Sequence, residues 1–149
     1  MEAQNKILFA YPVTHKDDMT KEDMCIPSPF FTGLEQNTIC SIVVTVGYSI
    51  IFGRRSYILI NVYKSGENDE PGPIIENGRV ETLKGGIFQN KLGIFLASFH
   101  MQDFEVKSSG YYEISVKLFE ADEEGNKTDK VLDSYCTQFY VQTKVKPNA

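Results

Sequence analysis

The chain has no tryptophan, only two histidines and only three cysteines among its 149 residues. Tryptophan is the ring most suited to stacking on sugars and cations, so its absence counts against a carbohydrate site. Cys25, Cys40 and Cys136 are odd in number and form no Cys-x-x-Cys pair, and no long apolar run follows the first residues. These absences predict free thiols and no signal peptide, and therefore a cytoplasmic protein.

Clusters of positive charge are also missing. Fifteen Lys and Arg stand against 20 Asp and Glu, and Arg54-Arg55 is the one Arg pair. Nucleic acid is therefore not an expected partner, because phosphate contacts need gathered basic side chains. The most apolar window, Ile39 to Phe52, is shorter than the ~20 residues of a membrane helix and is interrupted by polar residues, so no membrane association is expected either.

Motifs for chemistry are scarce as well. No Gly-x-Ser-x-Gly elbow, zinc spacing or phosphate loop occurs. His100 and Asp103 could form an acid–base pair, although a partly buried strand histidine is the simpler interpretation. The run Asp122 to Asn126 begins like a calcium loop, but Lys127 stands where that loop needs glycine. We therefore expect no enzyme, no metal and no cofactor.

What the chain does have is aromatic residues, 10 Phe and 8 Tyr, which favour strands. The organising stretch is Ser108 to Leu118. Gly110 suits a tight corner because it adopts positive φ without steric cost. After it, apolar side chains recur at every second residue, which is the pattern of a half-buried strand: Tyr112, Ile114, Val116 and Leu118.

The same alternation predicts further strands, separated by turn residues. Thr20 to Asp23 fits a capping box, which predicts one helical turn over Thr20 to Met24. Seven or eight strands with almost no helix predict an all-β, antiparallel sandwich in a single domain over 1–149. Within it we expect a first strand and long connection (1–35), a core (36–142) and a tail (143–149). The predicted strands are Lys6–Val13, Thr38–Tyr48, Ser56–Lys64, Ile74–Thr82, Leu92–Met101, Tyr111–Ala121 and Val131–Thr143.

The segment Ser56–Lys64 is unusual because both of its faces are fairly apolar. One face carries Ile58, Ile60 and Val62, and the other carries Tyr57, Leu59, Asn61 and Tyr63. Strands apolar on both faces are typical of sheet interiors, so we expect this one to be central or covered. A break in the chain is expected further on, at Gly85-Gly86.

The run Ser108, Gly110, Tyr112 and Ile114 resembles the Asp-x-Gly-x-Tyr-x-Cys sequence that opens the F strand of immunoglobulin-like domains. The resemblance implies that the Tyr112 hydroxyl anchors a corner by bonding to nearby backbone. Ile114 stands where that family has its second disulfide cysteine, and no core tryptophan is present. The resemblance therefore implies a disulfide-free, immunoglobulin-like sandwich; a jelly roll stays an alternative.

These observations predict a non-enzymatic, small acidic protein that binds a protein partner through loops or edge strands, with homodimer formation as a second expectation. A small chain of this style is typical of bacterial and phage accessory proteins. A sandwich binding a small molecule or carbohydrate is the alternative. The candidate contact residues are two aromatics, an arginine pair and an acidic loop: Phe30, Phe31, Arg54, Arg55, Glu67, Asp69 and Glu70.

Overall fold

The structure is a computed structural model that describes residues 4–66 and 80–144. Strands dominate it, and regular helix is limited to the four-residue α1 (Lys21–Met24) and the 3-10 turn η1 (Gln89–Lys91). The eight strands are β1 (Lys6–Val13), β2 (Phe30–Leu34), β3 (Thr38–Ile51), β4 (Ser56–Lys64), β5 (Val80–Phe88), β6 (Leu92–Val106), β7 (Gly110–Ala121) and β8 (Lys127–Thr143).

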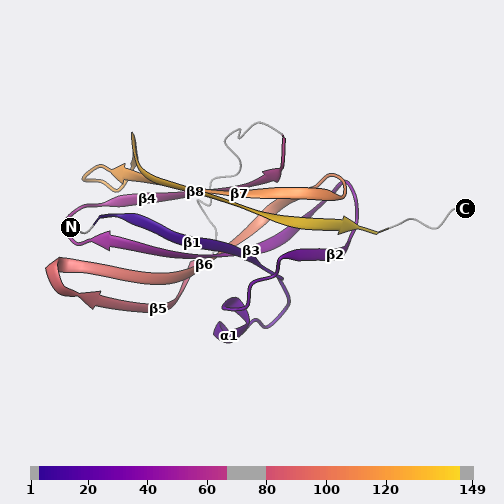
Figure 1. Cartoon of the computed structure of the whole chain (residues 1–149), viewed down its shortest axis with the longest axis horizontal. Helices are drawn as coiled ribbons and strands as arrows, with labels where there is room; N and C mark the ends of the chain where they lie inside the picture. The colour runs from indigo at the N-terminus through magenta and orange to yellow at the C-terminus, as the bar shows by residue number, and fades with distance from the viewer. Residues whose placement is uncertain (1–3, 67–79, 145–149) are drawn as a thin grey trace, which may run out of the picture.

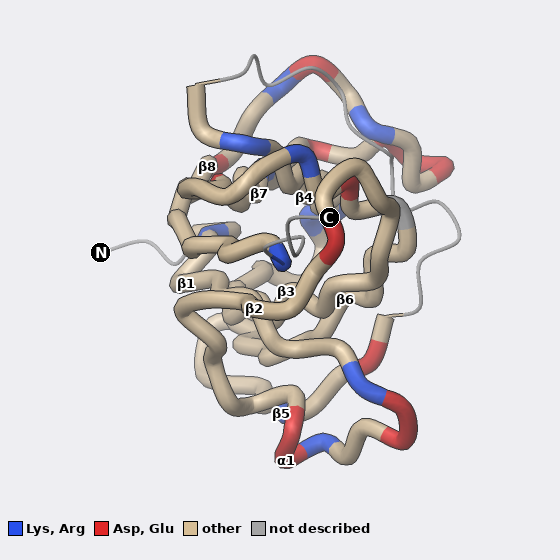
Figure 2. The backbone as a smooth tube through the Cα atoms, turned by 90° about the vertical axis from the view of Figure 1, so that its right-hand side faces the viewer, with Lys and Arg blue, Asp and Glu red and all other residues tan. Residues whose placement is uncertain are grey.

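The strands form two four-stranded sheets packed face to face (Figure 1). Sheet A has the order β1-β3-β6-β5 and sheet B the order β2-β8-β7-β4. Seen from the end of the molecule, β8, β7 and β4 make one layer, with β1, β3 and β6 beneath it (Figure 2). Pairing within the described strands is antiparallel except between β2 and β8. The predicted all-β sandwich is confirmed, with eight strands within the described residues.

The corner before β7 is anchored by the Tyr112 hydroxyl, as predicted. Gly110 has φ +148°. The hydroxyl accepts hydrogen bonds from the backbone N–H of Lys107 (3.0 Å) and of Ser108 (3.2 Å), and it donates one to the Ser108 carbonyl (2.8 Å). The ring is fully buried and packs edge-on to Phe104 and stacked on Phe139. The corner therefore ties the start of β7 to the end of β6.

The core lies between the two sheets, and alternating residues of each central strand supply it. On β7 the four predicted apolar residues from Tyr112 to Leu118 are all fully buried. They face a second set of buried side chains, which belongs to β3 and β6 of sheet A. Within that set, each inward side chain of β3 lies directly opposite one of β6. That set comprises Ile42, Val44, Val46, Ala97, Phe99 and Met101.

The connection between β1 and β2 covers the outer face of sheet A around Thr45. Thr20 caps α1 through the predicted capping box: its side chain accepts from the Asp23 N–H, and the Asp23 carboxylate accepts from the Thr20 N–H. Met24 is buried against the sheet, and its carbonyl accepts a hydrogen bond from Thr45 Oγ1 (2.8 Å). Thr45 is also 2.7 Å from Ser98 Oγ, so these buried outer-face hydroxyls are satisfied.

Two expectations about elements differ from the structure, and a third is tested only in part. Of the strand predicted over Ile74–Thr82, residues 74–79 lie outside the described part of the chain, and from Val80 onward the chain forms β5. Gly85 and Gly86 do not break the chain but lie inside β5, where the Phe95 ring occupies the space beside Gly85. The long connection contains β2, which joins sheet B.

The position of β4 is the most consequential difference. Its two apolar faces predicted a central or covered strand, yet β4 is the last strand of sheet B and pairs with β7 alone among the described strands. It is not central.

Candidate functional site

The candidate site arises where the chain changes sheets. The β1–β3 register ends at Val13 opposite Val43. The chain then leaves sheet A, makes the connection with α1, and enters sheet B as β2 at Phe30. Beyond Val43, the first residues of β3 (38–42) pair with β6 but have no described neighbour on the β1 side. The sandwich is therefore open along this edge.

A pocket of about 400 Å³ fills this opening. Its lining comes from both sheets and from both ends of the connection. Ile42, Phe104 and Phe31 are buried and supply an apolar floor. Hydroxyl groups of Thr14, Ser28, Thr32 and Ser41 supply polar positions in the lining. The remaining lining residues are His15, Pro27, Pro29, Phe30, Leu34 and Cys40.

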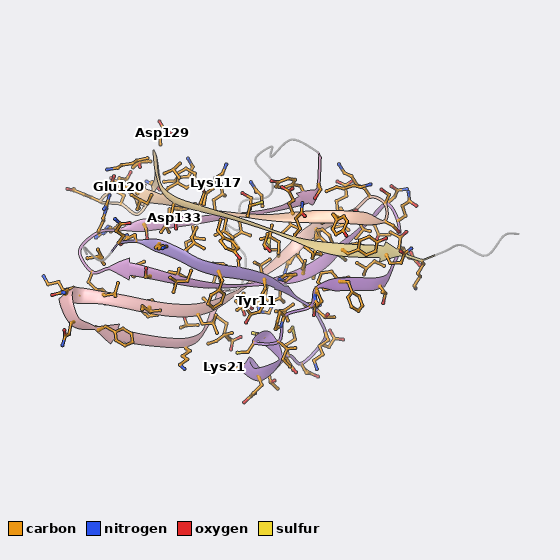
Figure 3. The ribbon with its side chains drawn as sticks, in the orientation of Figure 1. Tyr11, Lys21, Lys117, Glu120, Asp129 and Asp133 are labelled. Atoms are coloured by element: carbon orange, nitrogen blue, oxygen red, sulfur yellow. The ribbon has the colours of Figure 1, made fainter. Side chains whose placement is uncertain are left out.

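The two ends of the connection are hydrogen-bonded to each other, which fixes the mouth of the pocket. The Ser28 N–H donates to the Pro12 carbonyl (2.8 Å), and Ser28 Oγ accepts from the Thr14 N–H (3.2 Å). The middle of the connection is held by Tyr11, whose hydroxyl donates to the Cys25 carbonyl (3.2 Å) just after α1 (Figure 3). The pocket wall is thus built on hydrogen-bonded backbone.

Phe30 and Phe31 lie together at the pocket but have different roles. Phe31 points inward, is only 9% exposed and packs edge-on to Phe139 with ring centroids 5.3 Å apart. Phe30 points outward and is 58% exposed. Of the two predicted contact residues, Phe30 is therefore exposed, whereas Phe31 is part of the core.

Phe30 also begins a row of aromatic side chains across the outer face of sheet B. The register places Phe30 opposite Tyr140, and Tyr140 opposite Tyr111. The two tyrosine rings meet edge-on at 5.4 Å, and Tyr111 is 60% exposed. We call Phe30, Tyr140 and Tyr111 the aromatic row. Sequence reasoning missed both tyrosines, because their alignment depends on the pairing of three strands.

The titratable groups at the pocket give it little chemical reactivity. Burial raises the pKa of the Cys40 thiol, which keeps it protonated and lowers its nucleophilicity. His15 lines the mouth and is exposed. The arrangement is suited to holding an apolar group rather than to activating a nucleophile.

The structure places Arg54 and Arg55 at the opposite end of the sandwich from the pocket. They follow Gly53 in the β3–β4 turn, beside the β7–β8 turn. The Arg55 guanidinium donates to the Glu123 carbonyl, and the Arg54 carbonyl accepts from the Asn5 side chain (3.3 Å). A second hollow of about 310 Å³ lies there. Arg55 thus contacts the β7–β8 turn and Arg54 the segment before β1, and neither lines the Phe30 pocket.

The acidic loop residues Glu67, Asp69 and Glu70 lie outside the described residues. His100 is a half-buried residue of β6 opposite Val43, which confirms the interpretation as a partly buried strand histidine. The Asp103 side chain lies outside what is described, so the acid–base alternative is not tested.

Within residues 4–66 and 80–144, no group of three or more His, Cys, Asp and Glu side chains is placed to hold a metal ion. The start of the calcium-like run is instead a hydrogen-bonded turn, in which Asp122 Oδ1 accepts from the N–H groups of Glu124 and Asn126 (both 2.9 Å). Cys25, Cys40 and Cys136 are all free thiols. None of the helices described here has the length and apolar character needed to cross a membrane.

Fold and site together define the class: a two-sheet β-sandwich with an apolar pocket at an open edge. Compared by sequence, the chain matches no protein-family model and no curated protein.

Proposed function

We propose that this chain is an immunoglobulin-like, non-enzymatic binding protein that captures a segment of a partner protein at the Phe30 pocket. The observation that carries the proposal is the exposed Phe30, because it belongs both to the pocket lining and to the aromatic row. Aromatic side chains are enriched in the centres of protein–protein interfaces. The three free thiols support placement in a reducing compartment, the cytoplasm.

The strand order supports the immunoglobulin-like assignment. In that fold, strands A, B, E and D make one sheet and C, F and G the other. Assigning A to β1 and B to β3, and continuing in chain order from C at β4 to G at β8, gives the two observed sheets, with β2 as an added strand beside β8. The Tyr112 corner lies at the start of the strand that corresponds to F, where the family has its tyrosine corner.

The open edge supports capture of an extended segment. Residues 38–42 of β3 have no described neighbour on the β1 side, so a partner strand can continue sheet A beyond the point where β1 ends. One apolar side chain of that strand would enter the pocket above Ile42 and Phe104, and flanking residues would contact Phe30. Ile39, 68% exposed on the same stretch of β3, would be covered by the same segment.

The test uses Phe30→Asp, which places a charge at the mouth of the pocket. Its matched control is Ile87→Asp, at a more exposed apolar residue on β5 of the other sheet. Each variant is immobilised and exposed to an extract of source cells, and the captured proteins are quantified by mass spectrometry. We expect one protein to be retained by the wild type and by Ile87→Asp and to be lost with Phe30→Asp.

A photo-crosslinking residue locates the contact. Placed at Ser41 in the pocket lining, it should link to the same partner, and placed at Val131 on β8 it should not. Equal capture by the wild type and Phe30→Asp, or linking from Val131 alone, would contradict the proposal.

A small apolar ligand is the second candidate, favoured by the size of the pocket. Volumes of about 300–1,000 Å³ with an apolar lining and a few polar groups are typical of ligand sites. A thermal-shift screen distinguishes the two. A compound that raises the melting temperature of the wild type and Ile87→Asp, but not that of Phe30→Asp, would put this candidate first if no partner were captured.

A further inference from the structure

We propose that two copies of this chain pair through β4, antiparallel and about a two-fold axis at Ile60, to form one continuous eight-stranded sheet. The inference concerns the edge of sheet B opposite to β2 and does not depend on the pocket. It rests on three features of β4. Its backbone directs a row of hydrogen-bonding groups away from β7, its own residues include none of the protective features found on the other edges, and its sequence is complementary to itself in an antiparallel register.

The backbone of β4 presents a regular row of hydrogen-bonding groups away from β7. The Ala121 N–H donates to the Arg55 carbonyl, and the Ser65 N–H donates to the Tyr111 carbonyl. Between these two bonds the register is unbroken. Since the bonding direction alternates along an antiparallel strand, odd-numbered residues bond to β7 and even-numbered residues direct their N–H and C=O outward. These are Ser56, Ile58, Ile60, Val62 and Lys64.

The other three edge strands carry features that discourage pairing, and β4 carries none. Proteins protect sheet edges with proline, bulges, charges or short strands. In β1 there is Pro12 and a register shift, β2 has five residues and a shift at Gly33, and β5 has a shift beside Lys84. In β4 there is no proline, glycine or shift, and its one charge, Lys64, is the last residue.

The sequence of β4 is complementary to itself in the register that pairs all nine residues. About Ile60, Ile58 lies opposite Val62 of the second copy, and Ile60 opposite its own equivalent. These are even-numbered residues, so each pair exchanges backbone hydrogen bonds. On the outer face Tyr57 meets Tyr63 of the second copy, a favourable aromatic cross-strand pair. Lys64 lies opposite Ser56, so no like charges are opposed.

The pairing also explains a discrepancy. The two apolar faces of β4 are typical of a central strand, yet in one copy it is the last strand of its sheet. In the pair, β4 of each copy lies between β7 and the other β4. The outer-face side chains of Tyr57, Leu59 and Tyr63, half-buried in one copy, would then be flanked on both sides.

The experiment measures mass in solution by analytical ultracentrifugation over a dilution series. The two Leu59 side chains lie diagonally across the axis, about 7–8 Å apart. The wild type should reach twice the chain mass of 16.9 kDa. Leu59→Lys and Leu59→Glu should each remain single chains, and an equal mixture of the two should restore the doubled mass through opposite charges. Ile87→Lys, on the β5 edge, should pair like the wild type.

Amide hydrogen exchange of the wild type provides a readout that needs no variant. In the paired state the N–H groups of Ile58, Ile60 and Val62 should exchange slowly, and on dilution they should lose protection while Leu59 keeps it. A wild type that stays a single chain at every concentration overturns the inference. So does a doubled mass that Ile87→Lys abolishes, or one without concentration-dependent protection at the even-numbered residues.

Discussion

At the scale of single residues, the Tyr112 hydroxyl makes three hydrogen bonds to the backbone of the corner before β7. It bonds to two backbone N–H groups and one carbonyl while its ring is fully buried. Removing the hydroxyl leaves partly buried backbone groups of Lys107 and Ser108 without that partner. Such a loss costs more than the net value of a hydrogen bond where the corner shields these groups from water.

We expect Tyr112→Phe to lower the free energy of unfolding by about 1–3 kcal/mol. Chemical denaturation measures the change. Tyr111→Phe is the matched control, because that ring is largely exposed and its loss of a hydroxyl should alter stability by less than about 0.5 kcal/mol. Equal stability of the two variants would mean that the corner does not depend on the hydroxyl.

Glu113 links three strands on the outer face of sheet B. Its carboxylate accepts from the Tyr63 hydroxyl (2.9 Å) on β4 and from the Gln138 side chain (3.1 Å) on β8. These hydrogen bonds, the one from Tyr63 first, lower the pKa of Glu113 below its ordinary value of 4.5. The ionised form is therefore the one that the folded protein favours.

The sign of the resulting pH dependence follows from that direction. The contribution of Glu113 to stability is fully present above the unfolded-state pKa near 4.5 and is lost as the pH falls through the lower folded-state pKa. An NMR titration of the Glu113 side chain should show Tyr63→Phe moving the pKa upward. Tyr57→Phe, on the same face of β4, should not move it; an unchanged pKa in Tyr63→Phe would remove Tyr63 as the cause.

At the scale of elements, α1 is short and depends on its cap. A four-residue helix has no stability of its own, so the capping box and the burial of Met24 hold it in place. The same segment covers Thr45 on the outer face of sheet A through the Met24 carbonyl. Loss of the cap should therefore loosen the cover of that sheet as well as the helix.

We expect Thr20→Ala to destabilise the protein by about 1 kcal/mol. Thr20→Ser should restore most of that loss, since serine also accepts from the Asp23 N–H. Thermal unfolding compares the variants, and hydrogen exchange at Met24 reports the local effect. If serine and alanine proved equally destabilising, the cap would not be the cause.

The β1 and β4 edges show how the regularity of an edge strand decides what can bind beside it. In β1, a register shift lies between Ile7 and Phe9, and the strand ends at Val13, just after Pro12, which leaves the pocket beside β3. In β4, nothing interrupts the strand, and its edge stays regular over nine residues. One edge is thus suited to a partner segment and the other to a second copy.

At the scale of the whole molecule, Phe30 on β2 and the β4 edge lie on opposite edges of sheet B, with β8 and β7 between them. Distant sites without shared contacts behave additively. We therefore expect Phe30→Asp to leave self-association unchanged, and Leu59→Lys to leave capture of the partner or ligand at the pocket unchanged. Ultracentrifugation and the capture assay on both single variants and the double variant test this; any effect of one change on the other readout would show that the surfaces are coupled.

The local pattern of the chain was sufficient for most of the elements. The capping box at Thr20, the strand Lys6–Val13 and the corner at Gly110 and Tyr112 all follow from residue type and spacing. The candidate site was only half predictable. Two adjacent phenylalanines suggested a contact, but their separation into a buried Phe31 and an exposed Phe30 required the register of β2 on β8.

The sequence by itself determined the class of fold, because period-2 alternation and turn residues act within a few positions along the chain. Only the tertiary structure decided which strands are edges, where the pocket opens and which tyrosines align with Phe30. Those properties depend on which strands pair across long stretches of chain. The apolar composition of β4 shows this most clearly: burial of its two faces can come from neighbours in its own sheet or from another molecule, and residue type is the same in both cases.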